Sequence, residues 1–139
     1  MPIQITEVVP DLEEYNFLRS SVDWSLMDEE TCMKNLSPSV YSIIARDGCE
    51  TVGMGRIAGH GGMFFLVVDI IVIPDYQNKG IGKLIVKNLT DWIKVNCARD
   101  SRVLLVAAEG RERFYEKFGF QKVPNSSYRS EMQWIWKEN

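Results

Sequence analysis

Apolar and polar residues alternate along residues 3–9, which predicts a short β-strand that ends at Pro10. From Asp11 onward the apolar residues recur at the three- and four-residue spacing of a helix, and Asp11 is placed to cap it. A second helix is predicted over residues 28–36, because an acidic run opens it and Ser37-Pro38 ends it. The chain therefore begins with one strand followed by two helices.

Two strand-like runs follow, at residues 41–46 and 51–58, and they are joined at Asp47-Gly48, a sequence typical of hairpin turns. The longest apolar stretch of the chain then covers residues 63–73 and is interrupted only by Asp69. Its valine, isoleucine and phenylalanine content favours a buried central strand over a helix. These three runs predict an antiparallel meander.

The second half of the chain reads as helix, strand, helix, strand. An amphipathic helix is predicted to begin after Gly80, a buried strand over residues 103–107, a short helix over residues 111–118, and a last strand over residues 128–136. The sequence has no repeats and no linker, so we expect one domain, residues 1–139. Its fold class is mixed α/β, with a sheet that is both antiparallel and parallel.

Composition excludes several function classes. The net charge is −3 over 139 residues, without the basic balance or basic stripe that nucleic-acid-binding proteins usually show. Three separated cysteines and a single histidine give neither a disulfide framework nor metal-ligand spacing, which predicts no metal and a reduced, cytoplasmic setting. No apolar run approaches the roughly 20 residues of a membrane helix, so no membrane association is expected.

The candidate chemistry lies where the apolar strand runs into a glycine-bearing loop that opens a helix. Helix first-turn amides lack intrahelical partners, and Gly80 and Gly82 would let a phosphate approach them closely. Lys79 and Lys83 add positive charge, and Gln77 adds side-chain donors. A pyrophosphate fits such a site, although the two glycines alone could also make only a tight turn. The segment has neither P-loop nor Rossmann spacing.

The motif Gln77-x-x-Gly80-x-Gly82, between an apolar strand and an amphipathic helix, resembles the acetyl-CoA motif of the GNAT N-acetyltransferases. The run Phe114-Tyr115-Glu116-Lys117-Phe118-Gly119-Phe120 resembles that family's second signature, and the order of elements is similar over essentially the whole chain. The resemblance implies a GNAT-type mixed sheet flanked by helices, splayed between the fourth and fifth strands. It also implies acetyl-CoA as the acetyl donor.

The resemblance assigns roles to individual residues. Acetyl-CoA would be held by strand backbone groups and by the amides of the loop: Ile71, Val72, Ile73, Gln77, Asn78, Lys79, Gly80, Ile81, Gly82 and Lys83. An amide near Ile71 would stabilise the oxyanion. Tyr115 would protonate the leaving thiolate, because a phenol of pKa about 10 is a suitable donor to a thiolate of pKa about 8.5. A purely core-packing tyrosine is the alternative.

Asp69 is the candidate general base or amine anchor, because it is the one charge in an otherwise apolar strand. The alternative is a structural carboxylate at an irregularity of the sheet. Glu109, after the strand at residues 103–107, is a second substrate-side candidate, although a solvated loop glutamate is the favoured alternative. Trp24 is a candidate for an aromatic substrate wall, because the family's first helices cover the acceptor site, and a plain core residue is the equal alternative.

Taken together, these motifs predict an acetyl-CoA-dependent N-acetyltransferase that acts by direct attack of a primary amine, with the small-amine branch of the family as the expected one. Two alternatives stay open: acetylation of a protein N-terminus or lysine, and a non-catalytic acetyl-CoA-binding regulator. The resemblance also implies a homodimer formed through the terminal strands. The identity of the acceptor is not encoded in any motif of the sequence.

Overall fold

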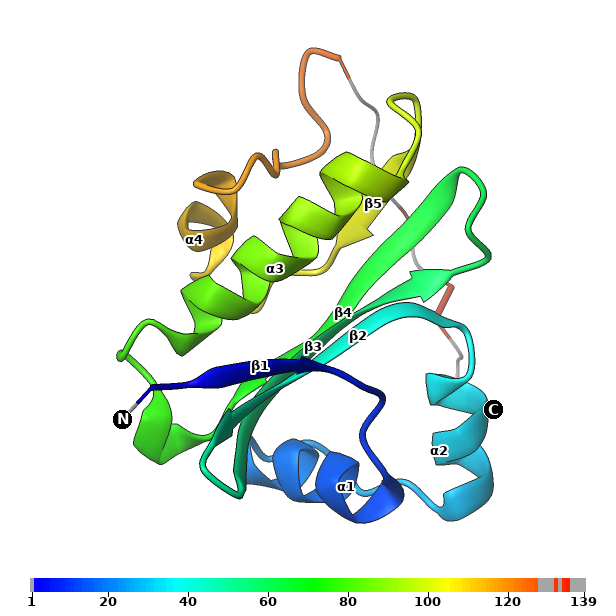
Figure 1. The fold of residues 1–139 in the computed structure, drawn as a ribbon. Helices are drawn as coiled ribbons and strands as arrows, with labels where there is room; N and C mark the ends of the chain where they lie inside the picture. Colours follow the sequence, from blue (N-terminus) through cyan, green and yellow to red (C-terminus); the bar gives the residue numbers. More distant parts are fainter. Residues whose placement is uncertain (1, 128–131, 133, 136–139) are drawn as a thin grey trace. The chain divides into compact units, whose positions relative to one another are not determined.

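A five-stranded sheet organises residues 1–106 of the computed structural model, which describes residues 2–127, 132, 134 and 135 (Figure 1). The strands lie side by side in chain order: β1 (Gln4–Glu7), β2 (Ser39–Asp47), β3 (Glu50–Gly59), β4 (Phe64–Val72) and β5 (Arg102–Leu105). The first four are antiparallel, and β4 pairs with β5 in parallel. The predicted mixed sheet is confirmed.

Helices α1 (Leu12–Ser21) and α2 (Glu29–Leu36) connect β1 to β2, and α3 (Ile81–Asn96) connects β4 to β5. Gly55 lies against α3, where an added Cβ would come within 2.6 Å of the Ile85 side chain. The next residue, Arg56, reaches the α1 side of the sheet through its bond to Asp69, which also binds Tyr15. Because successive residues of a strand face opposite sides, α1 and α3 cover opposite faces of the sheet.

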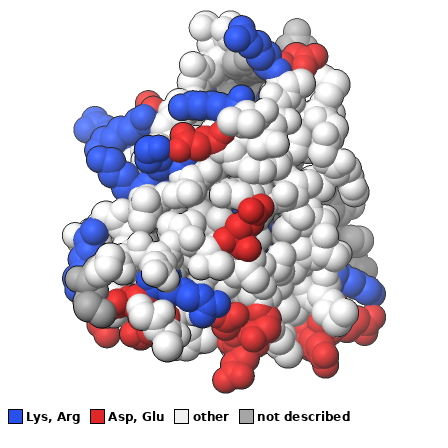
Figure 2. Space-filling model, viewed as in Figure 1, with Lys and Arg blue, Asp and Glu red and all other residues white. Residues whose placement is uncertain are grey.

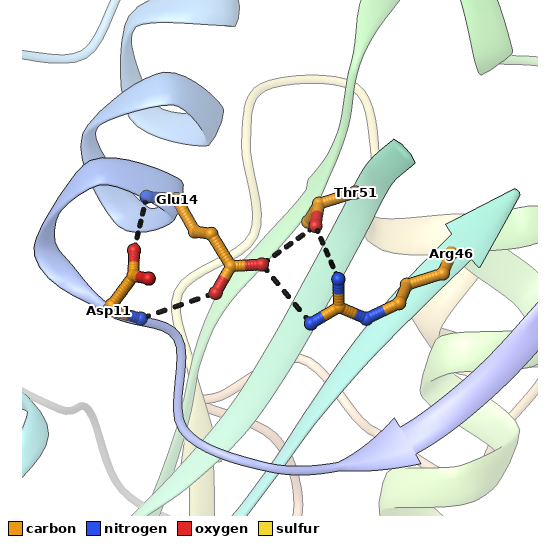
Figure 3. A network of polar contacts seen from close by, with 4 residues as sticks. All are labelled: Asp11, Glu14, Arg46 and Thr51. Carbon is orange, nitrogen blue, oxygen red and sulfur yellow. Dashed lines mark hydrogen bonds and ion pairs between the residues drawn. The ribbon is translucent and has the colours of Figure 1, made fainter. Parts of the chain in front are cut away.

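The N-terminus of α1 is capped as predicted and is also tied to the sheet (Figure 3). The Asp11 carboxylate accepts the Glu14 N–H at 2.8 Å, which completes a capping box with the Glu14 side chain. The other oxygen of that side chain, Oε2, accepts from Thr51 Oγ1 at 2.8 Å and from Arg46 Nη2 at 3.2 Å. One glutamate therefore serves both the helix cap and the β2–β3 hairpin.

Strand β4 is buried on one face only, which differs from the fully buried strand expected from its composition. Phe65 and Val67 are each 3% exposed and face the α3 side, whereas Phe64 is 68% and Leu66 40% exposed. The burial therefore alternates with the two-residue period of a half-covered strand in this part of β4. Composition alone indicated a strand but not how many of its faces are covered.

Residues 107–139 form a second compact unit, so the chain divides by its internal contacts into Met1–Val106 and Ala107–Asn139. This unit contains α4 (Glu112–Glu116), which is shorter than the predicted helix over residues 111–118. The predicted last strand, residues 128–136, lies mostly outside the described residues. Within the described part of the chain, no helix is long and apolar enough to cross a membrane.

Candidate active site

The edge of β4 that faces β5 is paired only along its first half. Parallel pairing runs from Phe64 opposite Arg102 to Val67 opposite Leu105, where β5 ends. Strand β4 continues to Val72 with β3 as its partner. In the described part of the chain, the second half of β4 therefore presents an open strand edge, as expected from the predicted splay. An open edge offers unpaired N–H and C=O groups to an extended ligand.

A β-bulge lies at the start of this open edge. Met54 of β3 pairs with Ile71, and Arg56 pairs with Val68. Between these two pairs, Asp69 and Ile70 of β4 together oppose one β3 residue, Gly55. Asp69 has φ = 55°, in the left-handed backbone region that residues other than glycine seldom adopt. A bulge leaves one residue outside the ladder, so a backbone amide at this point lacks a cross-strand partner.

The strand register determines which backbone groups face the open edge. Ile73 N–H donates to Val52 O at 2.9 Å, so that amide is bonded to β3, in contrast to the cofactor contact predicted for it. Hydrogen-bonded and non-bonded positions alternate in an antiparallel pair, which places the backbone groups of Ile71 on the β3 side as well. The open edge is therefore formed by Ile70 and Val72, and of the predicted strand residues it is Val72 that faces it.

The loop after β4 leads directly into the N-terminus of α3. It contains a 3-10 turn, η1 (Pro74–Tyr76), and then Asn78 and Gly80, whose φ angles are 62° and 85°. Gly80 is the N-cap of α3 and is exposed, with no atom within 4 Å of the position where a Cβ would stand. The first N–H groups of α3 thus lack intrahelical partners and follow an accessible loop, an arrangement that binds phosphate groups.

Two side chains fix the shape of this loop. Gln77 Nε2 donates to Val72 O at 2.9 Å, so the glutamine orders the loop against the end of β4 and does not offer that N–H to a ligand. Tyr76 Oη donates to Asp47 Oδ2 at 2.7 Å, and this hydrogen bond, with lesser contributions from burial and from Glu50, raises the pKa of Tyr76 to about 12. Lys79 Nζ lies 5.3 Å from the centre of the Tyr76 ring.

Asp69 is held by partners on β3 and α1. Its Oδ2 accepts from Arg56 Nε at 2.7 Å and from Tyr15 Oη at 2.8 Å, and both partners are buried, at 3% and 0% exposed. Burial, followed by the hydrogen bond to Asp69, raises the pKa of Tyr15. Asn35 Nδ2 donates to Tyr15 Oη at 2.7 Å, and Arg56 Nη1 donates to Ser39 Oγ at 3.2 Å. Sequence analysis missed these partners, although Arg56 stands out as the one charge within residues 51–58.

Trp24 is linked to the same cluster through Arg19. The Arg19 guanidinium lies 5.4 Å from the centre of the Trp24 ring and 5.6 Å from that of Tyr15. Trp24 is 42% exposed, so much of its surface is open to solvent. The predicted residues Trp24 and Asp69 are thus connected through Arg19 and Tyr15.

Tyr115 lies in α4, in the second unit, and is surrounded by aromatic rings. Its ring makes edge contacts with Phe114 and Phe120, at centroid distances of 5.1 Å and 6.1 Å. Burial raises the pKa of the Tyr115 phenol, and the charge of Arg111 acts against that shift. The phenol is therefore protonated at neutral pH. Glu109 precedes this helix in an exposed turn.

A search of known families matches residues 38–122 to the acetyltransferase (GNAT) domain. Among curated proteins, the uncharacterized N-acetyltransferase ycf52 of Pyropia yezoensis is 29% identical over 119 residues, which cover 83% of this chain and 67% of that protein. The matched domain includes β2 to β5, the α3 loop and Tyr115.

Solved structures agree with this match. A GNAT-family acetyltransferase of Streptococcus pneumoniae is 30% identical with a TM-score of 0.80, covering 99% of this chain and all of that one. A Staphylococcus aureus protein of unknown function, described as a probable acetyltransferase, is 29% identical with a TM-score of 0.82, covering 96% of this chain and 100% of that one.

A more distant structure shares the fold alone. It is AAC(6')-Iy in complex with the bisubstrate analogue CoA-S-monomethyl-acetylneamine, 13% identical with a TM-score of 0.67, covering 100% of this chain and 99% of that one. The domain match, the relatives and the splayed sheet lead to one conclusion: the chain belongs to the GNAT acetyltransferase family and is an N-acetyltransferase.

Proposed function

We propose that the protein transfers the acetyl group of acetyl-CoA to the primary amine of a small molecule. The observation that carries this proposal is the continuity between the open edge of β4 and the N-terminus of α3. An extended pantetheine chain can pair with a free strand edge, and a pyrophosphate can bind the free amides of a helix start. The GNAT family uses acetyl-CoA as its donor, and the structural neighbour AAC(6')-Iy binds a CoA-based analogue.

Acetyl-CoA binding is assigned to two groups of backbone atoms. The edge groups of Ile70 and the N–H of Val72, whose carbonyl already accepts from Gln77, would pair with the pantetheine arm, and the amides of residues 78–83 would hold the pyrophosphate. Lys79 and Lys83 are exposed beside the loop and add positive charge. Gly80 leaves this approach unobstructed, since its surroundings are open.

In the acetyl transfer we assign three roles to this chain. The bulge amide at the start of the open edge donates a hydrogen bond to the carbonyl oxygen as negative charge develops there. Tyr115 gives its phenolic proton to the departing thiolate as the C–S bond breaks, and burial keeps that proton in place until then. We assign Asp69, which is paired with Arg56, to the amine: its carboxylate would orient the incoming amine and, directly or through water, take the proton lost on forming the C–N bond.

The charge distribution supports an amine as the acceptor. The first turns of α1 and α2 carry Glu13, Glu14, Glu29 and Glu30. Figure 2 shows acidic side chains gathered over the part of this face where Figure 1 places these two helices. A negative potential concentrates cations near the surface, so a protonated amine would be drawn toward α1 and α2 before it loses its proton.

The test is a thiol-release assay with acetyl-CoA and a panel of primary amines: alkylamines, aromatic amines, a polyamine, an aminoglycoside and peptides with free N-termini or lysines. Mass spectrometry identifies the acetylated product. We expect turnover of small amines that exceeds that of the peptides and falls strongly in Tyr115→Phe. Faster acetylation of the peptides would contradict the small-molecule assignment. Tight acetyl-CoA binding without transfer to any amine would instead indicate a non-catalytic regulator.

A further inference from the structure

The bulge of β4 is held in place by a charged cluster that reaches it from four other elements. Arg56 comes from β3, Tyr15 from α1, Asn35 from α2 and Ser39 from the start of β2. They converge on the Asp69 carboxylate or on one of its direct partners. The Arg56 and Asp69 side chains are only 4% and 10% exposed, so water screens their ion pair little.

This cluster acts on the residue whose backbone is the least regular in the strand. Asp69 has a left-handed φ of 55° inside a strand, a conformation that is uncommon for residues other than glycine, although aspartate enters it more readily than most. Its Oδ2 oxygen accepts hydrogen bonds from two buried donors, Tyr15 Oη and Arg56 Nε. A carboxylate anchored in this way restrains the backbone torsions of Asp69 and, with them, the orientation of the next peptide group.

That next peptide group belongs to the open edge. The register places Ile70 at the edge of β4 beyond the end of its pairing with β5, and at the bulge where the β3–β4 ladder is interrupted. Rotating this peptide by a few tens of degrees would turn its N–H away from any ligand that lies along the edge. The geometry of the Ile70 N–H is thus controlled by groups that do not themselves reach the edge.

We propose that Arg56 and Tyr15 are positioning residues that, through the Asp69 carboxylate, aim the Ile70 N–H at the carbonyl oxygen of the acetyl group. This inference rests on the proposed binding of acetyl-CoA along β4. A buried ion pair is by itself weak evidence of a contribution to stability, since apolar residues often replace one without loss. Its location at the bulge beside the open edge gives it a role that apolar residues could not fill.

The experiment measures the polarisation of the carbonyl group directly. Acetyl-CoA labelled with carbon-13 at the thioester carbonyl is bound to the protein, and the infrared stretch of that carbonyl is recorded by isotope-edited difference spectroscopy. In the wild type we expect the stretch at lower frequency than for free acetyl-CoA, because an aligned N–H donor weakens the C=O bond. In Tyr15→Phe and Arg56→Lys we expect it to move back toward the free value.

Two further measurements separate positioning from general damage to the fold. Calorimetry should show that the affinity for CoA, which lacks the acetyl group, changes by less than about twofold in both variants. The kcat for thiol release should fall about tenfold, less than the roughly 10²–10³-fold loss expected when an oxyanion donor is deleted outright. The matched control is Tyr41→Phe, which removes a hydroxyl from a tyrosine that stacks on Trp92 at 5.4 Å, on the other face of the sheet.

The outcomes are distinguishable. If the wild type polarises the carbonyl and both variants do so equally, with unchanged CoA affinity, the positioning role is overturned and the proposed function stands. If the variants lose CoA affinity and thermal stability together with the infrared shift, the cluster is structural only and the inference is also overturned. If the wild type does not bind acetyl-CoA, the proposed function fails, and the positioning role fails with it.

Discussion

Tyr115, the general acid of the proposed transfer, lies in surroundings that keep its phenol protonated. Its ring makes edge contacts with two phenylalanine rings, and burial raises the pKa of its phenol above the ordinary tyrosine value of about 10. A general acid must be protonated when the thiolate leaves. Because the shift is upward, Tyr115 stays competent throughout the neutral range.

We predict that Tyr115→Phe lowers kcat for acetyl transfer by about 10²-fold, the usual contribution of a general acid, and leaves acetyl-CoA affinity unchanged. In the wild type, loss of activity from ionisation of Tyr115 should begin only above about pH 10, because the protonated phenol is the active form and its pKa is raised. Stopped-flow thiol release between pH 6 and the alkaline limit of stability tests both. An alkaline limb well below pH 10 that disappears in Tyr115→Phe would contradict the assignment.

Tyr76 gives a second pH-dependent prediction, at the cofactor loop. Its hydrogen bond to Asp47 raises the pKa to about 12 in the folded protein, against about 10 for an unfolded tyrosine. A raised pKa means that this contribution to stability is complete below about pH 10 and is lost as pH rises toward 12.

Tyr76→Phe should therefore lose stability at neutral pH and show a shallower decline of the free energy of unfolding above about pH 10 than the wild type. Urea denaturation followed at several pH values provides the measurement. If the free energy of unfolding declined with pH in the same way for the wild type and Tyr76→Phe, the loop would not be held by this bond. Acetyl-CoA affinity should also fall severalfold, because the bond fixes the loop that carries Gly80.

Prediction from sequence succeeded for single residues when the relevant contact was local. Asp11 was identified as a helix cap because its carboxylate bonds an amide only three residues ahead, at Glu14. Asp69 was identified as a lone charge in an apolar strand, but its partner Tyr15 lies 54 residues away in the chain. No local pattern indicates that such residues meet, because the sheet register decides it.

At the scale of elements, α1 depends on its first turn. Glu14 closes the capping box with Asp11 and accepts hydrogen bonds from Thr51 and Arg46 on the β2–β3 hairpin. The adjacent Glu13 shares the first turn and the same favourable position relative to the helix dipole.

We predict that Glu14→Ala lowers the free energy of unfolding by about 1–2 kcal/mol, since it removes the cap partner and the hairpin contact. The matched control, Glu13→Ala, should cost less than about 0.5 kcal/mol, since only the dipole interaction is lost. Chemical denaturation of both variants decides the point. Equal losses would mean that helix charge, not the network of Figure 3, stabilises α1.

The packing of α3 on the sheet depends on two glycines of β3, Gly53 and Gly55, which both lie against the Ile85 side chain. A Cβ at Gly53 would stand 2.8 Å from the Ile71 carbonyl oxygen and 3.1 Å from Ile85, and the backbone oxygen cannot move aside as a side chain can. We predict that Gly53→Ala destabilises the protein by about 1–3 kcal/mol through overpacking. Gly62→Ala, where nothing lies within 4 Å, should change stability little. Thermal denaturation of the pair tests this, and equal melting temperatures would contradict it.

The order and type of the elements were largely predictable, because each carries its own periodicity. Strand β4 shows where this fails: its uninterrupted apolar run indicated burial on both faces, whereas Phe64 and Leu66 are exposed. Periodicity cannot show which neighbour covers a face. It also could not place the bulge at Asp69, which leaves Ile70 and Val72 at the open edge of β4 and Ile73 on the β3 side.

At the scale of the whole molecule, the splayed sheet, the helix that follows β4 and the acidic first turns of α1 and α2 fit a single interpretation. The donor is expected along β4 and at α3, and the amine on the side of α1 and α2. The family could be predicted from sequence because its two motifs are short and local. The acceptor could not, because the acidic and aromatic groups that would select it come together only in the folded chain.

The most direct test of this account is a calorimetric titration of acetyl-CoA into the wild type, Gly82→Glu and Gly62→Glu. The glutamate at position 82 places a side chain and a negative charge in the first turn of α3, whereas position 62 is an exposed glycine of the β3–β4 connection. We predict micromolar binding by the wild type and by Gly62→Glu, and no measurable binding by Gly82→Glu. Equal binding by all three proteins would show that the N-terminus of α3 does not hold the pyrophosphate.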